Sequence, residues 1–314
     1  DQPLDGLDGG VLQDIPWFSD FLVLWAREWG TFLDSEDSFN DEVLERFRKH
    51  SPEYRVEDSM IPEVLRPEKL RPNDPSGRWF SFNQFFARQL NPGLRPITAP
   101  DDNTTLTAPG DCTYKMAYRI DDAGRIRPPI VPKGTHTYAT VQMLLDKSRY
   151  ADAFNGGHFI HLFLGPYSYH RFHTPVAGTV MECYPLTGRV YLKVSLSDGQ
   201  FDAADSADDG YEFKQARGIL TIDTKDSPYG DVGVVAVIPV GMSHVSGVNM
   251  THQTSRECRK GDEFGYFTFG GSDVIILTQK GTDPQWNPAF VEGTKHYSLY
   301  GTSLGQVTPF NRPQ

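Results

Sequence analysis

The N-terminal part of the chain carries the apolar pattern of an amphipathic helix. Between Ile15 and Leu33, apolar side chains recur every three to four residues, which is the period of a helix with one apolar face. The apolar residues are mainly aromatic: Trp17, Phe18, Phe21, Leu22, Leu24, Trp25, Trp29 and Phe32. We expect this face to pack into the core. As an alternative, its tryptophans could lie on a bilayer surface and collect a lipid substrate.

Two further helices are expected before residue 100. One covers Phe39–Lys49, with Ser38 or Asn40 as its N-cap. The other covers Phe80–Leu90 and ends at an Asn-Pro-Gly turn, because proline and glycine terminate helices. The residues between them, 51–78, are rich in proline and charge and predict a linker or a wrapping segment.

From about residue 106 the pattern changes to short β-type runs separated by Gly, Pro, Asn and Asp. Strands without alternating helices favour an antiparallel sheet, and only one helix, Thr140–Leu145, is expected here. We predict an α+β fold in which N-terminal helices, within residues 1–100, pack on an antiparallel β-sandwich or flattened barrel formed by residues 101–314. The expected strands are Leu106–Thr107, Thr113–Tyr118, His158–Leu164, Gly178–Tyr184, Val190–Val194, Ile219–Thr224, Gly233–Val240, Glu263–Phe269 and Val274–Gln279.

The composition is that of an ordinary soluble globular protein, with 38% hydrophobic and 12% aromatic residues among 314. A net charge of −11 argues against a nucleic-acid partner and gives no general attraction to an anionic membrane. Three cysteines, an odd number without metal-type spacing, favour a reducing compartment. We expect a cytoplasmic location, with peripheral membrane contact and a homodimer as further options.

A glycine-rich segment near the C-terminus offers unusual chemistry. Two glycines precede Ser272 and allow a sharp bend that leaves the Gly271 carbonyl accessible. A serine hydroxyl that attacks this carbonyl exchanges the amide for an ester. Elimination and hydrolysis then leave a pyruvoyl group, an electrophile that condenses with amines. A hairpin between two strands is the alternative interpretation of this segment alone.

A second reactive segment is Tyr169-His170-Arg171-Phe172-His173-Thr174-Pro175. Two histidines three residues apart, in an irregular segment that ends in proline, can face one pocket. A metal site is the competing interpretation, because His158 and His161 form another pair with the same spacing. Side chains three apart on a strand point to opposite faces, so these two cannot easily share one ion. We therefore expect no metal.

Both segments, together with Phe85-Phe86-Ala87-Arg88-Gln89-Leu90-Asn91-Pro92-Gly93-Leu94-Arg95-Pro96-Ile97, resemble the phosphatidylserine decarboxylase family. The three motifs follow in the expected order, from about Phe80 to about Leu277. The resemblance implies a pyruvoyl-dependent decarboxylase that cleaves itself between Gly271 and Ser272 and needs no pyridoxal phosphate. The 43-residue C-terminal fragment, residues 272–314, would stay associated with the rest of the chain.

The resemblance also assigns roles to individual residues. His173 is expected to be the base that takes the proton of Ser272, and His170 its companion at the reacting backbone or the substrate carboxylate. Asp111 follows Ala-Pro-Gly in a segment similar to one of the family and is the candidate that orients His173. Candidates for contact with the substrate are Tyr169, His170 and His244.

Asp273 departs from the family pattern, which commonly has serine or threonine after the cleaved serine. Its carboxylate could repel an oxyanion formed at Gly271, or it could supply a local base. Two other functions stay open. The chain could be a soluble decarboxylase of free, for example aromatic, amino acids that does not act on phosphatidylserine. It could also be an unprocessed homologue, either a binding protein or a hydrolase that uses Asp111, His173 and Ser272.

Overall fold

The computed structural model describes residue 12 and residues 15–49, 54–59, 79–127, 139–190, 195–197, 200–202, 210–241, 247–268, 272–291 and 296–312. Its helices are α1 (Pro16–Leu33), η2 (Glu36–Ser38), α2 (Asp41–Arg48), η3 (Val56–Asp58), α3 (Phe82–Phe86), α4 (Val141–Leu145), η5 (Ala151–Phe154), η7 (Tyr211–Phe213) and α5 (Pro288–Val291).

The expected helices are present, and side chains cap the N-terminal ends of α2, α3 and α4. Asn40 caps α2, as its side chain accepts a hydrogen bond of 3.0 Å from the amide of Val43. α3 is shorter than expected and ends at Phe86. After this point the chain turns Arg88 inward, where its guanidinium donates to the carbonyl of Ser168 at 2.9 Å.

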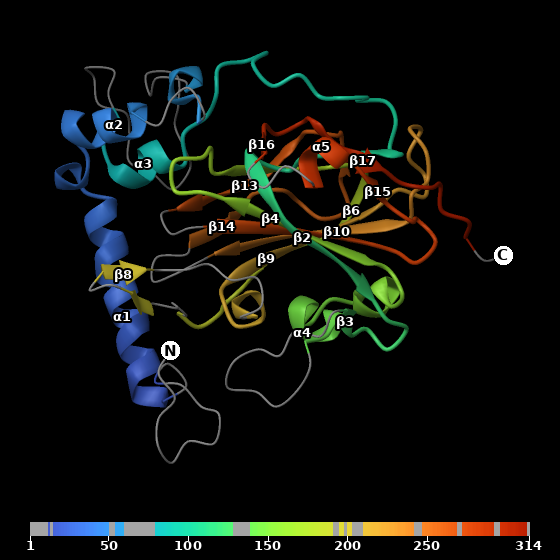
Figure 1. Ribbon diagram of the computed structural model, residues 1–314, viewed down its shortest axis with the longest axis horizontal. Coiled ribbons are helices and arrows are strands. Elements are labelled where there is room, and N and C mark those ends of the chain that lie inside the picture. Colours follow the sequence, from blue (N-terminus) through green and yellow to red (C-terminus); the bar gives the residue numbers. More distant parts are fainter. Residues whose placement is uncertain are drawn as a thin grey trace.

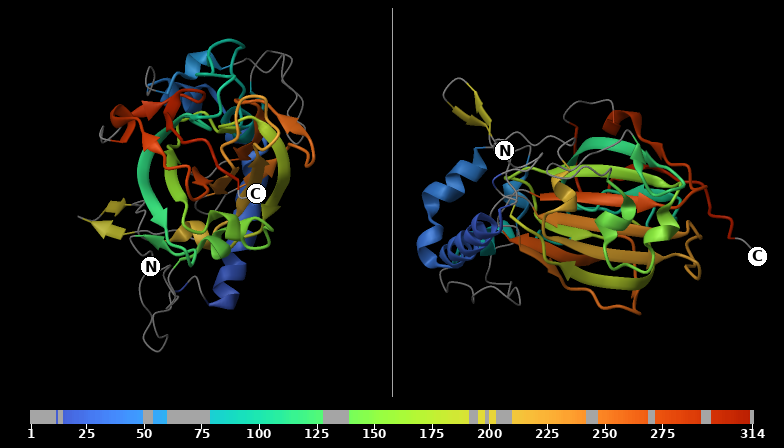
Figure 2. Two further views of the ribbon diagram at one scale, coloured as in Figure 1. Left: turned by 90° about the vertical axis from the view of Figure 1, so that its right-hand side faces the viewer. Right: turned by 90° about the horizontal axis from the view of Figure 1, so that it is seen from below.

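A nine-stranded sheet is the largest sheet among the described residues and lies at the centre of the β region (Figure 1). Its order is β12 (Glu257–Cys258), β6 (Gly178–Leu186), β9 (Arg217–Asp223), β10 (Val234–Gly241), β14 (Ser272–Thr278), β4 (His158–Leu164), β2 (Cys112–Ile120) and β16 (Tyr297–Ser298), with β3 (Ile126–Arg127) paired to β2. Neighbouring strands run antiparallel throughout this order. Seen end-on, the strands curl around a common centre (Figure 2).

Smaller sheets complete the β region. One contains β1 (Thr105–Thr107), β17 (Ser303–Gln306) and β15 (Gln285–Trp286), and another contains β11 (Gly247–Met250), β13 (Glu263–Thr268) and β5 (Arg171–His173). β7 (Ser195–Ser197) and β8 (Gln200–Asp202) pair as a two-stranded sheet. The predicted α+β class with a mainly antiparallel curled sheet is confirmed. Most of the strand expected over Val190–Val194 lies outside the described residues.

Two apolar cores lie on the two faces of the large sheet. Along β14, Val274 and Ile276 belong to the first core, while Ile275 and Leu277 belong to the second, because successive residues of a strand face opposite sides. The first core also contains residues of the small sheets and of α3, and the second contains α4 and η5. The sheet is therefore covered on both faces, and any polar group on β14 must be satisfied within the protein.

Aromatic packing anchors α2 and α3 to the first core. Phe85 of α3 is fully buried, and its ring lies 4.8 Å from Phe47 and 4.9 Å from Phe39. Phe47 in turn contacts Tyr167, with ring centroids 5.0 Å apart, in the segment that leads to His170. Residues of the predicted N-terminal region and of the β region thus share one core.

The aromatic face of α1 differs from the expectation that it would be buried. Trp17 is 67% exposed and Trp25 44% exposed, and only Ser19 and Leu33 of this helix are buried. The reason is that α1 joins the rest of the protein at its C-terminal end, where Leu33 enters the first core. α1 runs along one side of the molecule (Figure 1).

None of the helices in the described residues combines the length and the apolar character that a bilayer span requires.

Phe85→Ala is expected to lower the free energy of unfolding by about 3–5 kcal/mol, because it opens a cavity at the junction of the helices and the sheet. Urea denaturation measures this loss. The matched control is Trp17→Ala, which changes an exposed aromatic side chain and should alter stability by no more than about 0.5 kcal/mol. Equal losses in both variants would contradict the assignment of Phe85 as the anchor.

Candidate functional site

Ser272 is the first residue of β14 and is held from both sides. It pairs with Leu164 of β4 and with Gly241 of β10, and its side chain is fully buried. The residues just before it, including Gly271, lie outside the described residues, as does His244. The side chain of Ser272 points to the same face as Val274, which is the side of the first core.

His170 is the hydrogen-bond partner of Ser272. Its Nδ1 lies 3.0 Å from Oγ of Ser272, and its Nε2 lies 3.4 Å from the carbonyl oxygen of Pro166. A carbonyl oxygen can only accept, so the second contact assigns the ring hydrogen to Nε2. Nδ1 is then free to accept the hydroxyl proton of Ser272, which is the arrangement that a general base requires.

The surroundings keep His170 neutral. Burial lowers its pKa well below the ordinary value, and the nearby positive charge of Arg88 lowers it further. The ring of Phe86 stacks on the imidazole with centroids 3.7 Å apart, which fixes its plane. Since only a neutral imidazole can take a proton, these neighbours maintain the form of His170 that can act on Ser272.

His173 lies in the same segment but has other partners. Its Nδ1 donates to the carbonyl of Gly261 at 2.9 Å, and its Nε2 accepts from the hydroxyl of Tyr169 at 3.0 Å. The ring stacks on Tyr300 at 3.9 Å with an interplanar angle of 1°. Burial lowers the pKa of His173 to about 4, and the charge of Arg171 adds to this effect. His173 is therefore a neutral, fully bonded ring.

Asp111 belongs to a buried cluster of charges centred on Arg95. The guanidinium of Arg95 donates to Asp111 at 2.8 Å and to Asp58 at 2.6 Å, and all three side chains are buried. Asp111 also accepts a hydrogen bond of 2.8 Å from the amide of Tyr300, whose ring covers His173. Asp111 thus acts on His173 through the position of Tyr300.

The structure brings together some of the residues singled out in the sequence, with a different division of roles. The hydroxyl of Ser272 contacts His170, whereas His173 was expected to be its base. The carboxylate of Asp111 binds Arg95, whereas it was expected to orient His173. The reason is that both ring nitrogens of His173 are already used by Tyr169 and Gly261. The hydrogen-bonded series Asp111–His173–Ser272, on which a hydrolase would depend, is not present in this arrangement.

Several residues of the site had no role in the sequence interpretation. Phe86, Arg88 and Arg95 lie in the Phe-Phe-Ala-Arg to Arg-Pro-Ile segment, so the segment could be recognised but the contacts of its side chains could not. Tyr300, which stacks on His173, gave no signal, because it stands in a polar tail far along the chain. These four side chains hold the two histidines and Asp111 in place.

Asp273 faces away from Ser272. It lies on the side of the second core, fully buried, with its carboxylate 3.2 Å from Nε2 of His161. The hydroxyl of Tyr211 donates a hydrogen bond to the same carboxylate. Because the sheet separates Asp273 from the Ser272 hydroxyl, it does not serve as the local base that was considered as one possibility.

The histidines that suggested a metal site have separate surroundings. His161 pairs with Asp273, while His158 lies 4.0 Å from Asp283. Within the described ranges there is no group of three or more His, Cys, Asp or Glu side chains placed to hold a metal ion. Ser272 is instead a buried serine at the start of a strand, in contact with a neutral imidazole.

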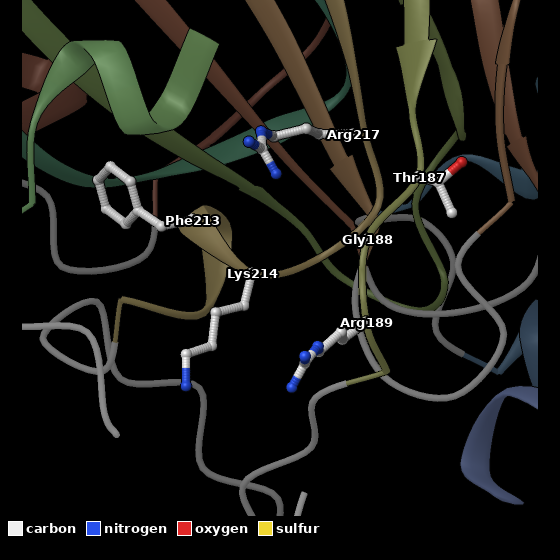
Figure 3. A pocket seen from close by; sticks show the side chains of 6 residues that line it. All are labelled: Thr187, Gly188, Arg189, Phe213, Lys214 and Arg217. Atoms are coloured by element: carbon white, nitrogen blue, oxygen red, sulfur yellow. The ribbon is translucent and has the colours of Figure 1, made fainter. Parts of the chain in front are cut away.

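A pocket of about 460 Å³ lies beside Arg217, the first residue of β9 (Figure 3). Arg217 of β9 pairs with Val240 of β10, which pairs with Asp273. The guanidinium of Arg217 donates to backbone carbonyls of Leu144 and Met143 at 2.6 and 3.0 Å. The pocket lining, which is Thr187, Gly188, Arg189, Phe213, Lys214 and Arg217, contains no acid–base pair like that of Ser272 and His170.

The chain is similar to known decarboxylases. A family model described as phosphatidylserine decarboxylase matches residues 82–303. The chain is 31% identical over 207 residues to phosphatidylserine decarboxylase proenzyme 2 of Oryza sativa subsp. japonica, covering 66% of this chain and 30% of that protein. It is 27% identical over 284 residues to decarboxylase iboD of Amanita muscaria, covering 83% of this chain and 77% of the relative.

A bacterial relative is also similar. The phosphatidylserine decarboxylase proenzyme of Anoxybacillus flavithermus is 33% identical over 205 residues, which cover 64% of this chain and 67% of that protein. The chain thus spans most of the length of the bacterial and Amanita relatives, but only about a third of the rice protein.

The buried His173 predicts a pH dependence of stability. Its pKa of about 4 in the folded protein is below the ordinary value of 6.5, so the unfolded chain binds the proton more tightly. The resulting stability is fully present above pH 6.5 and is lost as the pH falls toward 4. Between pH 7 and pH 5 this loss is about 2 kcal/mol.

Urea denaturation of the wild type and of His173→Gln at both pH values measures this contribution. The variant should lose less stability on acidification, whatever its stability at pH 7. An identical pH dependence in the two proteins would show that His173 does not carry the effect.

Proposed function

Because the chain belongs to the phosphatidylserine decarboxylase family, whose members are carboxy-lyases, we propose that it is a pyruvoyl-dependent decarboxylase that forms its cofactor by cleaving itself between Gly271 and Ser272. The observation that carries this proposal is the 3.0 Å contact between Oγ of Ser272 and Nδ1 of the neutral His170. It supplies a nucleophile and a base at the residue that would become the cofactor.

Self-cleavage needs only groups of the chain and water. His170 takes the hydroxyl proton of Ser272 as Oγ bonds to the carbonyl carbon of Gly271. The carbon–nitrogen bond then breaks and the nitrogen of Ser272 receives the proton, which leaves an ester. Loss of the α-proton of Ser272 expels Gly271 as a carboxylate and forms dehydroalanine. Addition of water and loss of ammonia leave the pyruvoyl group.

The fold supports retention of both fragments. After cleavage, residues 272–314 would keep β14 paired with β10 and β4, in the middle of the large sheet. β16 and β17 would keep their pairing with β2 and β1. A strand buried among neighbours on both sides does not dissociate without unfolding the sheet, so we expect a tight complex of two chains.

The pyruvoyl carbonyl would supply an electrophile that condenses with the substrate amine and accepts the electrons released as carbon dioxide leaves. The residues around position 272 favour this reaction by excluding water. Phe86 and Phe267 line the imidazole of His170, with ring centroids at 3.7 and 6.4 Å, and both are fully buried. In this apolar environment a substrate carboxylate is poorly solvated, which favours its loss. His170 is placed to hold and return a proton at Nδ1.

We propose phosphatidylserine as the substrate, and the exposed aromatic face of α1 supports this choice. The C-terminal end of α1 connects to the site, because Asp34 accepts a hydrogen bond of 2.9 Å from Asn83 of α3. The neighbouring Phe86 stacks on His170. A helix that presents Trp17 and Trp25 to solvent, tied to the site in this way, can rest on a bilayer and bring the site close to a lipid headgroup.

A free amino acid is the second candidate substrate. The same carbonyl accepts any primary amine, and the net charge of −11 gives no attraction to vesicles that contain anionic lipid. The chain also matches decarboxylase iboD over 83% of its length, more than it matches the phosphatidylserine decarboxylase proenzymes of rice or Anoxybacillus.

Intact-mass measurement under denaturing conditions tests self-cleavage. The wild type should give two chains, and Ser272→Ala a single uncut chain. His170→Gln should slow cleavage at least about a hundredfold, because it removes the general base. His173→Gln is the matched control and should cleave faster than His170→Gln. A wild type that remains uncut while releasing carbon dioxide would refute the proposal. If His173→Gln cleaves more slowly than His170→Gln, His173 and not His170 is the base.

Decarboxylation assays distinguish the substrates. Phosphatidylserine in phosphatidylcholine vesicles should be decarboxylated, and a Trp17→Ser, Trp25→Ser double variant should lose about tenfold or more of this activity, because two aromatic side chains no longer enter the bilayer. The double variant should cleave itself normally. Release of carbon dioxide from free tryptophan or tyrosine, but none from vesicles, would establish the second candidate instead.

A further inference from the structure

Asp273, the residue that follows Ser272, places a negative charge close to the peptide bond that the proposed self-cleavage breaks. Asp273 is fully buried, and its carboxylate has no access to water that could screen it. During cleavage, negative charge develops on the carbonyl oxygen of Gly271, two residues back along the chain. Two residues of chain span at most about 7 Å, whatever their conformation. An unbalanced carboxylate at such a distance in a protein interior opposes the developing charge enough to slow the reaction by tens of fold.

His161 lies close enough to the carboxylate of Asp273 to neutralise its charge. It belongs to β4, opposite Ile275 of β14, so that Asp273 is its diagonal neighbour on the same face of the sheet. Nε2 of His161 lies 3.2 Å from the carboxylate of Asp273, and both side chains are fully buried. Burial by itself lowers the pKa of His161, but Asp273, with a smaller contribution from the charge of Glu212, raises the pKa overall. The pair therefore favours an imidazolium beside a carboxylate.

Other groups that face the pair come from η7 and β2. Tyr211 donates its hydroxyl to Asp273, and the neighbouring Glu212 is fully buried, with no hydrogen-bond partner for its carboxylate oxygens among the described residues. Burial raises the pKa of Glu212 to about 7, and the positive charge of His161 opposes this rise. Lys115 of β2 lies with its amine 5.9 Å from the Tyr211 ring centroid. Nε2 of His161 lies within ion-pair distance of the Asp273 carboxylate.

We infer that His161 is the counter-ion that makes self-cleavage compatible with an acidic residue at position 273, so that His161 and Asp273 are positioning residues for the reaction of Ser272. The inference rests on the proposed function, since it concerns the same cleavage. Neither residue touches the reacting atoms, because both lie on the opposite face of β14 from the serine hydroxyl. Their effect is electrostatic and acts through the sheet.

The inference predicts a particular pattern among three variants. His161→Gln leaves the buried carboxylate unbalanced and should slow cleavage at least about tenfold. Asp273→Asn removes the opposing charge itself and should cleave at least as fast as the wild type. The double variant His161→Gln, Asp273→Asn should cleave faster than His161→Gln alone and approach the wild-type rate, because no charge remains to balance. Purely structural damage would accumulate in the double variant instead.

The rate of appearance of the 43-residue fragment, residues 272–314, is followed by denaturing intact mass after synthesis in a cell-free system. Rates are compared at pH 7 and at alkaline pH. In the wild type, cleavage should slow as the pH rises through the raised pKa of His161, because the counter-ion loses its charge. In the double variant this alkaline decrease should be absent. This comparison does not require the single His161 variant to fold.

Results from either the rate comparison or the pH comparison would overturn the inference. In the rate comparison, such a result is a His161→Gln variant that folds and cleaves as fast as the wild type, or a double variant that is no faster than His161→Gln. In the pH comparison, it is the same alkaline decrease in the wild type and the double variant. A wild-type chain that stays uncut under all conditions would refute the proposed function itself, and with it this role. A wild type that cleaves normally, beside variants without the predicted pattern, would refute only the counter-ion.

Discussion

The site depends on one constraint, which is that the first residue of a central strand must present its hydroxyl to a neutral imidazole. β14 is fixed by β10 and β4 on its two edges, so the position of Ser272 is set by the pairing of the whole sheet. The orientation of the His170 ring is fixed independently, by stacking on Phe86 and by a hydrogen bond to the carbonyl of Pro166. Because neither group can move without breaking several contacts, their 3.0 Å separation is a property of the fold.

A buried guanidinium links the N-terminal segment to this site. Arg95 binds Asp58 and Asp111 together, and the attraction of these carboxylates holds its pKa above the ordinary value despite the opposing effect of burial. Removal of the guanidinium would leave Asp111 with the amide of Tyr300 and Asp58 with the partly exposed Arg55. Loss of the buried cation that the two carboxylates share costs several kcal/mol. Asp111 binds the backbone amide of Tyr300, so the same cluster fixes the position of the Tyr300 ring that stacks on His173. The helical region is therefore part of the site's support.

The sequence allowed much of the fold to be predicted, but less of the site. Period and capping located α2 and α4, and the runs rich in β-branched and aromatic residues located β4, β10 and β14. Burial of the α1 face could not be judged, because a helical period shows that a face is apolar and not what covers it. Likewise the motif around His170 and His173 identified both histidines, but only the contacts with Pro166, Tyr169 and Gly261 decide which ring is free to act.

Two histidines on the two faces of the sheet illustrate how the neighbours of a side chain decide its chemistry. His161 and His170 are both fully buried, and burial lowers the pKa of each. Arg88 adds positive charge near His170 and keeps it neutral, whereas Asp273 adds negative charge beside His161 and favours its cation. The proposed base and the proposed counter-ion therefore stay distinct, although β14 alone lies between Ser272's contact with His170 and Asp273's contact with His161. An acidic residue can follow Ser272 because its charge is met on the face where no bond is made or broken.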